Sequence, residues 1–159
     1  MRVDVIIKMS FAVIGKLGQG YSEKGVEWIP PLWKEANSNF AEISSLAKKD
    51  ENENLVGFWG AMSDTDDSFN RWSEQGKYLA GCEVVDKATP PENWTKWMIP
   101  SYKYLVVKCT QETYAKIFND MIEQYFPDNN HQLVGAVHEY YDPQESDGGL
   151  YLYFPIERL

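Results

Sequence analysis

The amino-acid sequence predicts one α+β domain in which a βαββ unit occurs twice and the strands form a mostly antiparallel sheet. Strand-length and helix-length patterns follow one another in the same order in both halves of the chain. The tripeptide Leu-Val-Gly at residues 55–57 recurs at residues 133–135, each time after the polar stretch that follows a helix. A chain of 159 residues with 43% hydrophobic content suffices for one core. We therefore expect a single domain, with repeat one at about residues 1–88 and repeat two at about 97–159.

The first unit begins with a strand and a helix. Residues Asp4–Lys16 are β-branched and apolar in a strand pattern, and a glycine-rich stretch then ends the strand. The pair Pro30-Pro31 suits the first turn of a helix, which we expect at Pro31–Lys48. Its apolar residues repeat at helical spacing: Leu32, Ala36, Phe40, Ile43 and Ala47.

Two further strands complete the first unit. We expect them at Leu55–Met62 and Tyr78–Val85, on either side of the acidic, turn-rich segment Ser63–Gly76. A loop with Pro90 and Pro91 then leads to the second unit.

The second unit repeats this order. Its predicted elements are a strand at Tyr102–Cys109, a helix at Thr113–Phe126, and strands at Leu133–Tyr141 and Leu150–Ile156. The helix has one apolar stripe that should pack on a sheet, made of Tyr114, Ile117, Phe118, Met121, Ile122 and Tyr125. Joining the two units edge to edge removes two open strand edges and leaves the two helices flanking a ligand cleft over the combined sheet.

Composition argues against several function classes. The net charge of −9 and the pI near 4.7 disfavour direct nucleic-acid binding, which needs a clustered basic surface. The longest apolar runs are strand-length, so we expect no membrane-spanning segment. The N-terminus lacks a secretory signal pattern, because Asp4, Lys8 and Ser10 interrupt its apolar positions. A cytoplasmic location is therefore expected.

We also expect no metal and no cofactor. Cys82 and Cys109 lie on separate predicted strands and fit reduced core thiols. His131 and His138 do not have a metal-ligand spacing. The glycines within residues 15–20 match neither phosphate-binding pattern, and no helix opens directly from them.

Glu139 is the most unusual candidate for chemistry, because it falls near the end of an apolar strand. Period two places it on one face with Val137 and Tyr141. A buried ionised carboxylate is costly unless paired, so a neighbouring base satisfies Glu139, or it lines a cavity and awaits a cationic or hydrogen-bonding ligand, or it sits at an exposed strand end. The first unit has Trp59 and Ala61 where the second has Val137 and Glu139, so the halves differ in chemistry.

Aromatic residues make up 14% of the chain and supply candidate cleft walls. Flat rings stack on planar ligands and attract cations through the ring face, although ordinary packing also explains each residue. The aromatic residues that we expect to border the cleft are Trp28, Trp33, Trp59, Trp97, Tyr141, Tyr151 and Tyr153.

Together these features resemble a known family. The duplicated units, a helix after Pro30-Pro31, Tyr78–Val84, Ile99–Tyr102 and the run Glu139-Tyr140-Tyr141 occur in an order similar to that of the GyrI-like effector-binding domain, found attached to AraC-type and MerR-type transcription regulators. The resemblance implies a groove between the halves for lipophilic, often cationic aromatic compounds.

The resemblance also implies site residues. Glu139 corresponds to the family's central glutamate, and Tyr153 to an aromatic position on the last strand. The family's regulators carry a helix-turn-helix domain, whereas here the first strand begins by Asp4. We therefore expect no DNA binding through that module.

Three functions remain open from the sequence. The first is a non-enzymatic protein that binds lipophilic, cationic aromatic small molecules. The second is a hydrolase that opens strained cyclopropane rings, as some relatives do, with Glu139 as general acid or base and Tyr141 as hydrogen-bond donor. The third is a protein-binding inhibitor with the acidic segment Ser63–Glu74 as its surface. Exposed outer strands also leave a homodimer open.

Overall fold

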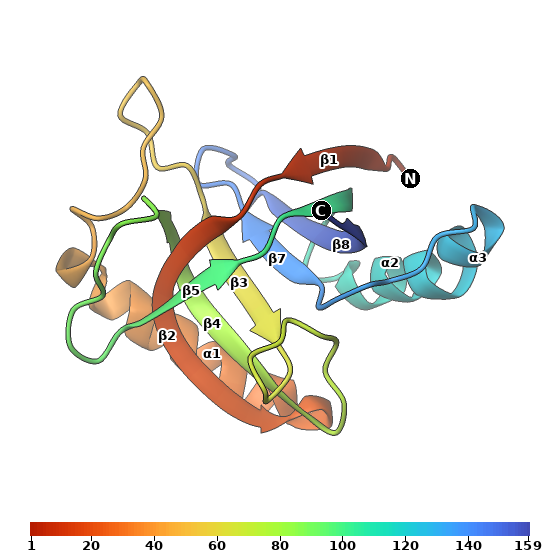
Figure 1. Ribbon diagram of the computed structural model, residues 1–159, viewed down its shortest axis with the longest axis horizontal. Helices are drawn as coiled ribbons and strands as arrows, with labels where there is room; N and C mark the ends of the chain where they lie inside the picture. Colours follow the sequence, from red (N-terminus) through yellow and green to blue (C-terminus); the bar gives the residue numbers. More distant parts are fainter.

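The computed structural model describes all 159 residues as one eight-stranded sheet with helices on one of its faces (Figure 1). The strands are β1 (Asp4–Lys8), β2 (Phe11–Tyr21), β3 (Phe58–Ser63), β4 (Gln75–Val84), β5 (Thr95–Ile99), β6 (Tyr102–Cys109), β7 (His138–Tyr141) and β8 (Leu150–Arg158). The helices are α1 (Gly25–Ser38), α2 (Tyr114–Asp120) and α3 (Phe126–Asp128), with short 3-10 turns at Ser22–Lys24 and Phe40–Glu42 and a π-helical turn, η3, at Met121–Tyr125. None of these helices is long and apolar enough to cross a lipid bilayer.

The sheet confirms the predicted α+β fold. Its strand order is β1-β6-β8-β7-β3-β4-β2-β5, and every neighbouring pair is antiparallel. The two halves join edge to edge where β3 pairs with β7, and Gly60 lies directly opposite Glu139. The outer strands are exchanged, because β1 pairs with β6 and β5 pairs with β2. Each half therefore contributes its leading strand to the sheet of the other.

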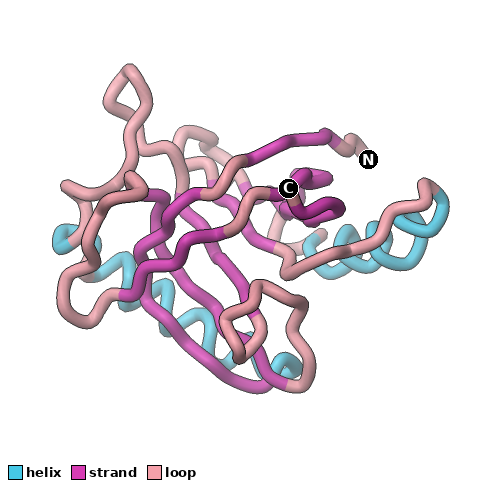
Figure 2. The backbone as a smooth tube through the Cα atoms, in the orientation of Figure 1, coloured by secondary structure: helices cyan, strands magenta, loops and turns pink.

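The two faces of the sheet carry different cores. On the face covered by α1, the apolar side chains of β2 and β4 form one cluster, and on the same face α2, η3 and α3 cover β6 and β8. The other face curls round a third cluster that draws on both halves, including Phe11, Trp59, Tyr104 and Tyr153. In Figure 2 the helices lie along the sheet and leave its curled interior to strands and loops.

Several predicted boundaries are wrong. The first predicted strand is two strands, β1 and β2, because the chain turns at residues 9–10 and passes from one half to the other. The strand β5 was not predicted. Of the predicted strand Leu133–Tyr141, only the last four residues pair as β7.

The first helix also begins earlier than predicted. Pro30 and Pro31 lie inside α1 and not in its first turn. A proline cannot donate the helical hydrogen bond, so the carbonyls one turn earlier, those of Val26 and Glu27, lose their partners. Both residues are exposed, so water satisfies these carbonyls at little cost. The segment Phe40–Ala47, predicted as helix, forms turns and packs Ile43 and Ala47 against the sheet.

Candidate ligand-binding cleft

A cleft of about 800 Å³ lies between α1 and α2, over the seam where β3 meets β7. Helix α1 contributes Ile29 and Trp33, and α2 contributes Tyr114 and Phe118. The floor comes from the sheet and the segment before β7: Met62, Tyr78, Ala136, Val137, Glu139 and Tyr141. The lining is mostly apolar, and its volume suits a drug-sized organic molecule.

Glu139 lies at the floor of this cleft and is held by three tyrosine hydroxyls. Tyr78 donates to Oε1 at 2.5 Å, and Tyr114 donates to Oε2 at 2.5 Å. Tyr141 makes a longer bond to Oε1 at 3.4 Å. Trp33 donates from Nε1 to the hydroxyl of Tyr78 at 2.8 Å, which turns that hydroxyl's own proton toward the carboxylate. The carboxylate is therefore fixed in one orientation by donors from α2 and the sheet, and Trp33 of α1 orients one of them.

No cationic side chain pairs with Glu139, although the residue is only 9% exposed. The other deeply buried carboxylate, Glu83, shows the usual solution, because Lys8 and Lys48 lie 3.1 and 3.4 Å from its oxygens. Burial raises the pKa of Glu139, and the three tyrosine bonds oppose this shift. The cleft therefore contains a buried carboxyl group that accepts three hydrogen bonds and has no cationic partner.

The tyrosines around Glu139 act as donors and not as acids. Burial, together with the adjacent carboxylate, raises the pKa values of Tyr78, Tyr114 and Tyr141. All three hydroxyls therefore stay protonated over the physiological range. These hydroxyls donate hydrogen bonds that stabilise an ionised Glu139, and they do not become negatively charged themselves.

A glycine makes room for this arrangement. Gly60 lies opposite Glu139 in the sheet, and a methyl group there would collide with the hydroxyl of Tyr78 and lie 2.8 Å from Oε1 of Glu139. Tyr78 is fully buried, so its ring has no space to retreat. The bond between Tyr78 and Glu139 therefore depends on the missing side chain at position 60.

The structure places three of the predicted site residues in the cleft: Glu139, Tyr141 and Trp33. The rings of Trp33 and Tyr141 meet edge to face at 5.4 Å and separate the cleft from a smaller recess behind them. Trp28 does not line the cleft itself, but its ring stacks on Trp72, which does. Its Nε1 donates to the carbonyl of Tyr21.

The expectation that the other four aromatic residues border the cleft is wrong. Trp59, Trp97 and Tyr153 lie in the cluster on the opposite face of the sheet, and Tyr151 packs against that cluster. Trp59 and Ala61 share this face, so they are not the positional counterparts of Val137 and Glu139. The alternation of side chains between the two faces is offset by one residue between β3 and β7. The residue of β3 that lies opposite Glu139 is therefore Gly60.

Sequence reasoning missed the two closest partners of Glu139. Tyr78 was assigned only to a strand and Tyr114 only to the apolar stripe of the second helix. A signal was present, because a buried tyrosine hydroxyl requires a hydrogen-bond partner, and Tyr114 lies on the apolar stripe of a helix that should pack on the sheet. The acidic segment Ser63–Glu74 contributes Arg71 and Trp72 to the cleft, next to Glu23.

The sequence profile of the integron-associated effector binding protein family, Cass2, matches residues 7–156 of the chain. The chain belongs to this family. The predicted resemblance to GyrI-like effector-binding domains is thereby confirmed. A sequence comparison with characterised proteins finds no match.

Solved structures show that the effector-binding fold extends over the full chain. The structure of SAV2435 bound to tetraphenylphosphonium superposes with a TM-score of 0.70 at 14% identity, covering 99% of this chain and 94% of that one. The integron cassette protein VCH_CASS2 of Vibrio cholerae gives a TM-score of 0.66 at 14% identity, with 98% and 95% covered. The C-terminal domain of EcmrR gives 0.58 at 14% identity, with 99% and 98% covered. At these identities the likeness concerns the fold.

Proposed function

We propose that this protein binds lipophilic organic cations in the cleft between α1 and α2. The observation that carries the proposal is the buried carboxylate of Glu139, which has three hydrogen-bond donors and no cationic partner in an apolar, aromatic cleft. A bound cation would supply the missing counter-charge, and the tyrosines would keep the carboxylate ionised to meet it.

The aromatic walls favour the same class of ligand. Trp33, Tyr141 and Trp72 present ring faces and edges that attract a delocalised cation and its aryl groups. A solvated metal ion or a small ammonium ion would leave most of an 800 Å³ cleft unfilled. The membership of an effector-binding family, and a solved relative bound to tetraphenylphosphonium, support a bulky aryl cation.

The charge of Glu139 should dominate the selectivity. Two unit charges about 5 Å apart interact by about 3 kcal/mol at an effective dielectric constant of about 20. This energy corresponds to about a 100-fold preference for a cation over an uncharged ligand of the same shape. Apolar burial alone makes no such distinction.

Two probes of the same shape and opposite charge test the proposal. Tetraphenylphosphonium and tetraphenylborate should be titrated against the protein, with tryptophan fluorescence or calorimetry as the readout. We expect the cation to bind and the anion to bind far more weakly. Glu139→Gln keeps the shape and one acceptor, and should weaken binding of the cation by about 10- to 100-fold.

The matched control is Glu83→Gln, which removes the other buried carboxylate, on the opposite face of the sheet. This variant should leave the affinity for tetraphenylphosphonium unchanged wherever the protein is folded. Equal affinity of the wild type for both probes, or an unchanged affinity of Glu139→Gln for the cation, would refute charge recognition by Glu139.

A further inference from the structure

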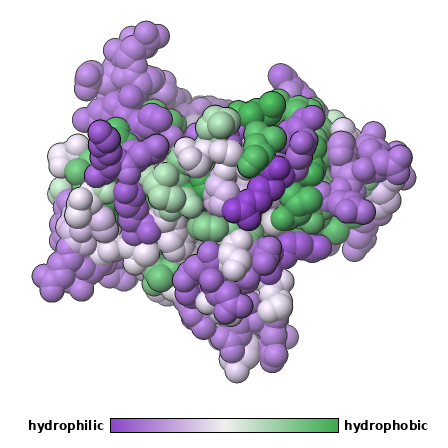
Figure 3. Space-filling view, viewed as in Figure 1, coloured by the Kyte–Doolittle hydropathy of each residue, from purple (hydrophilic) through white to green (hydrophobic).

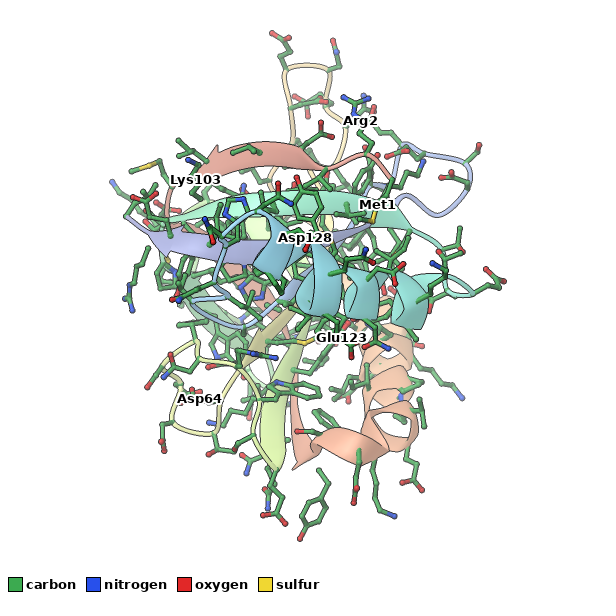
Figure 4. All side chains as sticks on the ribbon, turned by 90° about the vertical axis from the view of Figure 1, so that its right-hand side faces the viewer. Met1, Arg2, Asp64, Lys103, Glu123 and Asp128 are labelled. Atoms are coloured by element: carbon green, nitrogen blue, oxygen red, sulfur yellow. The ribbon has the colours of Figure 1, made fainter.

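The outer strand β1 presents an apolar face to solvent. Val5 and Ile7 alternate on one side of the strand, and Met9 follows its end; the three residues are 59%, 62% and 66% exposed. The strand β1 pairs only with β6, so the backbone groups on its outer side have no partner within the chain. Figure 4 shows β1 at the upper margin of the sheet above β6, and Figure 3 shows apolar surface where β1 lies in Figure 1.

The strand at the other margin of the sheet is protected. In the topology β5 is the counterpart of β1, since each is the outer strand of one half. Lys96 lies within β5 and Pro100 follows it directly, and both residue types discourage pairing with another strand. Only Met98 of β5 is a strongly exposed apolar residue. The strand β1 has no proline, and its one lysine, Lys8, ends the strand and is paired with Glu83 at 3.1 Å.

We propose that β1 pairs antiparallel with β1 of a second copy of this chain, about a twofold axis at Ile6. The sequence of β1 is complementary to itself in this register. Val5 lies opposite Ile7 of the second copy, so apolar residues meet apolar residues. Asp4 lies opposite Lys8 of the second copy, which is paired with Glu83 of its own chain, so no like charges face each other. Just outside the strand, Val3 lies opposite Met9 in the same register.

Other pairings of the same strand are less favourable. A parallel arrangement in register would place Asp4 beside Asp4 and Lys8 beside Lys8 of the second copy. A shift by one residue would place Val5 opposite Lys8 or Ile7 opposite Asp4, and would put the exposed apolar residues of the two copies on opposite faces of the sheet. The antiparallel register about Ile6 joins the two sheets into one continuous sheet and covers the apolar strip of both copies.

Single cysteine substitutions test the register directly. Residues directly opposite each other in an antiparallel pair have Cα atoms about 4.5–5.5 Å apart, which is within the range for a disulfide. Ile6→Cys faces itself across the axis, so oxidation should link it into a covalent dimer. The native Cys82 and Cys109 are both buried and do not compete.

The matched control is Val5→Cys, which lies opposite residue 7 and about 8 Å from its own copy, beyond disulfide reach. This variant alone should stay unlinked, whereas an equimolar mixture of Val5→Cys with Ile7→Cys should yield a linked heterodimer. Absence of a link in Ile6→Cys, or equal linking of Val5→Cys by itself, would overturn the proposed register.

Sedimentation of the uncrosslinked protein from micromolar to hundreds of micromolar provides the second test. We expect a concentration-dependent dimer in the wild type, a monomer in the double variant Val5→Lys with Ile7→Lys, and an unchanged dimer in Met98→Lys on β5. Circular dichroism checks that each variant is folded. A wild type that stays monomeric throughout, or a dimer that survives the two β1 lysines, would contradict the proposal.

Discussion

At the scale of single residues, the cleft differs from a generic apolar pocket in how one charge is supported. The carboxylate of Glu139 receives hydrogen bonds from Tyr78 and Tyr114 at 2.5 Å, and Trp33 orients the first of these donors. Burial raises the pKa of the carboxyl group, while the donors lower it. The protonation state of Glu139 should therefore control both the affinity for a cation and the stability of the fold.

The pH dependence of cation binding should follow the tyrosine bonds. When the pH falls below the pKa of Glu139, protonation removes the charge that the cation meets, and affinity falls. Tyr78→Phe or Tyr114→Phe removes a short bond to the ionised form, raises the pKa of Glu139 further and moves the loss of affinity to higher pH. Tyr141→Phe removes only the 3.4 Å bond and should move it less. Titrations with tetraphenylphosphonium over a pH series measure the pH at which each variant loses half of its affinity. The same midpoint pH in all three variants would contradict the expected order.

The thermal stability of Glu139→Gln should depend on pH with a defined sign. The pKa of Glu139 in the folded protein is raised above its ordinary value of 4.5, so the folded state holds this proton more tightly than the unfolded state. The resulting stability is present in full below pH 4.5 and is lost as the pH rises through the folded pKa. The melting temperature of Glu139→Gln should therefore exceed that of the wild type at alkaline pH, with the difference shrinking in acid.

The control for this stability measurement is again Glu83→Gln. Its carboxylate is paired with Lys8 and Lys48, so its removal leaves cations near a buried site and should lower the melting temperature at neutral pH. A lower melting temperature for Glu139→Gln at alkaline pH would show that the tyrosine bonds outweigh the cost of burying its charge.

At the scale of secondary-structure elements, the seam between β3 and β7 positions the site. It sets Glu139 opposite Gly60, and it places α1 and α2 on either side of one line across the sheet. Much of this was predictable from the sequence. The alternation of Val137, Glu139 and Tyr141 indicated a carboxylate on an apolar strand face, and the apolar stripe of the second helix indicated a helix packed on the sheet.

Other features of the elements could not be predicted, for identifiable physical reasons. Residues 9–10 contain no glycine or proline, so nothing in the sequence separates β1 from β2. Thr95–Ile99 is short and lies between proline-containing segments, so local propensity does not favour β5 as a strand. The bonds from Tyr78 and Tyr114 to Glu139 join residues far apart in the chain, and only the tertiary fold brings them together.

A substitution at the seam tests its role. Gly60→Ala places a methyl group against the Tyr78 hydroxyl and Glu139, and overpacking of this kind costs about 1–3 kcal/mol of stability. We expect a lower melting temperature and a large loss of affinity for tetraphenylphosphonium in the fraction that is folded. Gly57→Ala, whose methyl group meets only the ring of Tyr140 beside the cluster on the opposite face, is the control and should bind normally where it is folded. Normal binding by Gly60→Ala would contradict the need for an open position 60.

At the scale of the whole molecule, the sheet separates two tasks. One face, under the helices, holds the cleft, and the curled face holds an aromatic core shared by both halves. This division explains why aromatic content alone could not identify the site. The sequence predicts that both Trp33 and Trp59 border the cleft. Only Trp33 does so, whereas Trp59 is 1% exposed and lies in the core.

Alanine substitutions should separate the two faces. Trp59→Ala removes a large core side chain and should lower the unfolding free energy by about 3–5 kcal/mol. Trp33→Ala should cost less stability, because its ring is only partly buried, but should weaken binding of tetraphenylphosphonium through loss of the ring and of the donor to Tyr78. Chemical denaturation and ligand titration of both variants give the comparison. Weaker binding by folded Trp59→Ala than by Trp33→Ala would indicate that the ligand binds on the curled face and would contradict the proposed site.

The central claim is that Glu139 is the anionic partner of a cation in the cleft, and its own titration tests this most directly. The side-chain carboxyl carbon of Glu139 can be followed by carbon-13 NMR in the free protein and in the complex with tetraphenylphosphonium, and assigned by its absence in Glu139→Gln. We predict a pKa above 4.5 in the free protein and a clearly lower pKa in the complex, because a neighbouring cation favours the ionised form. The same pKa in both states would contradict the claim.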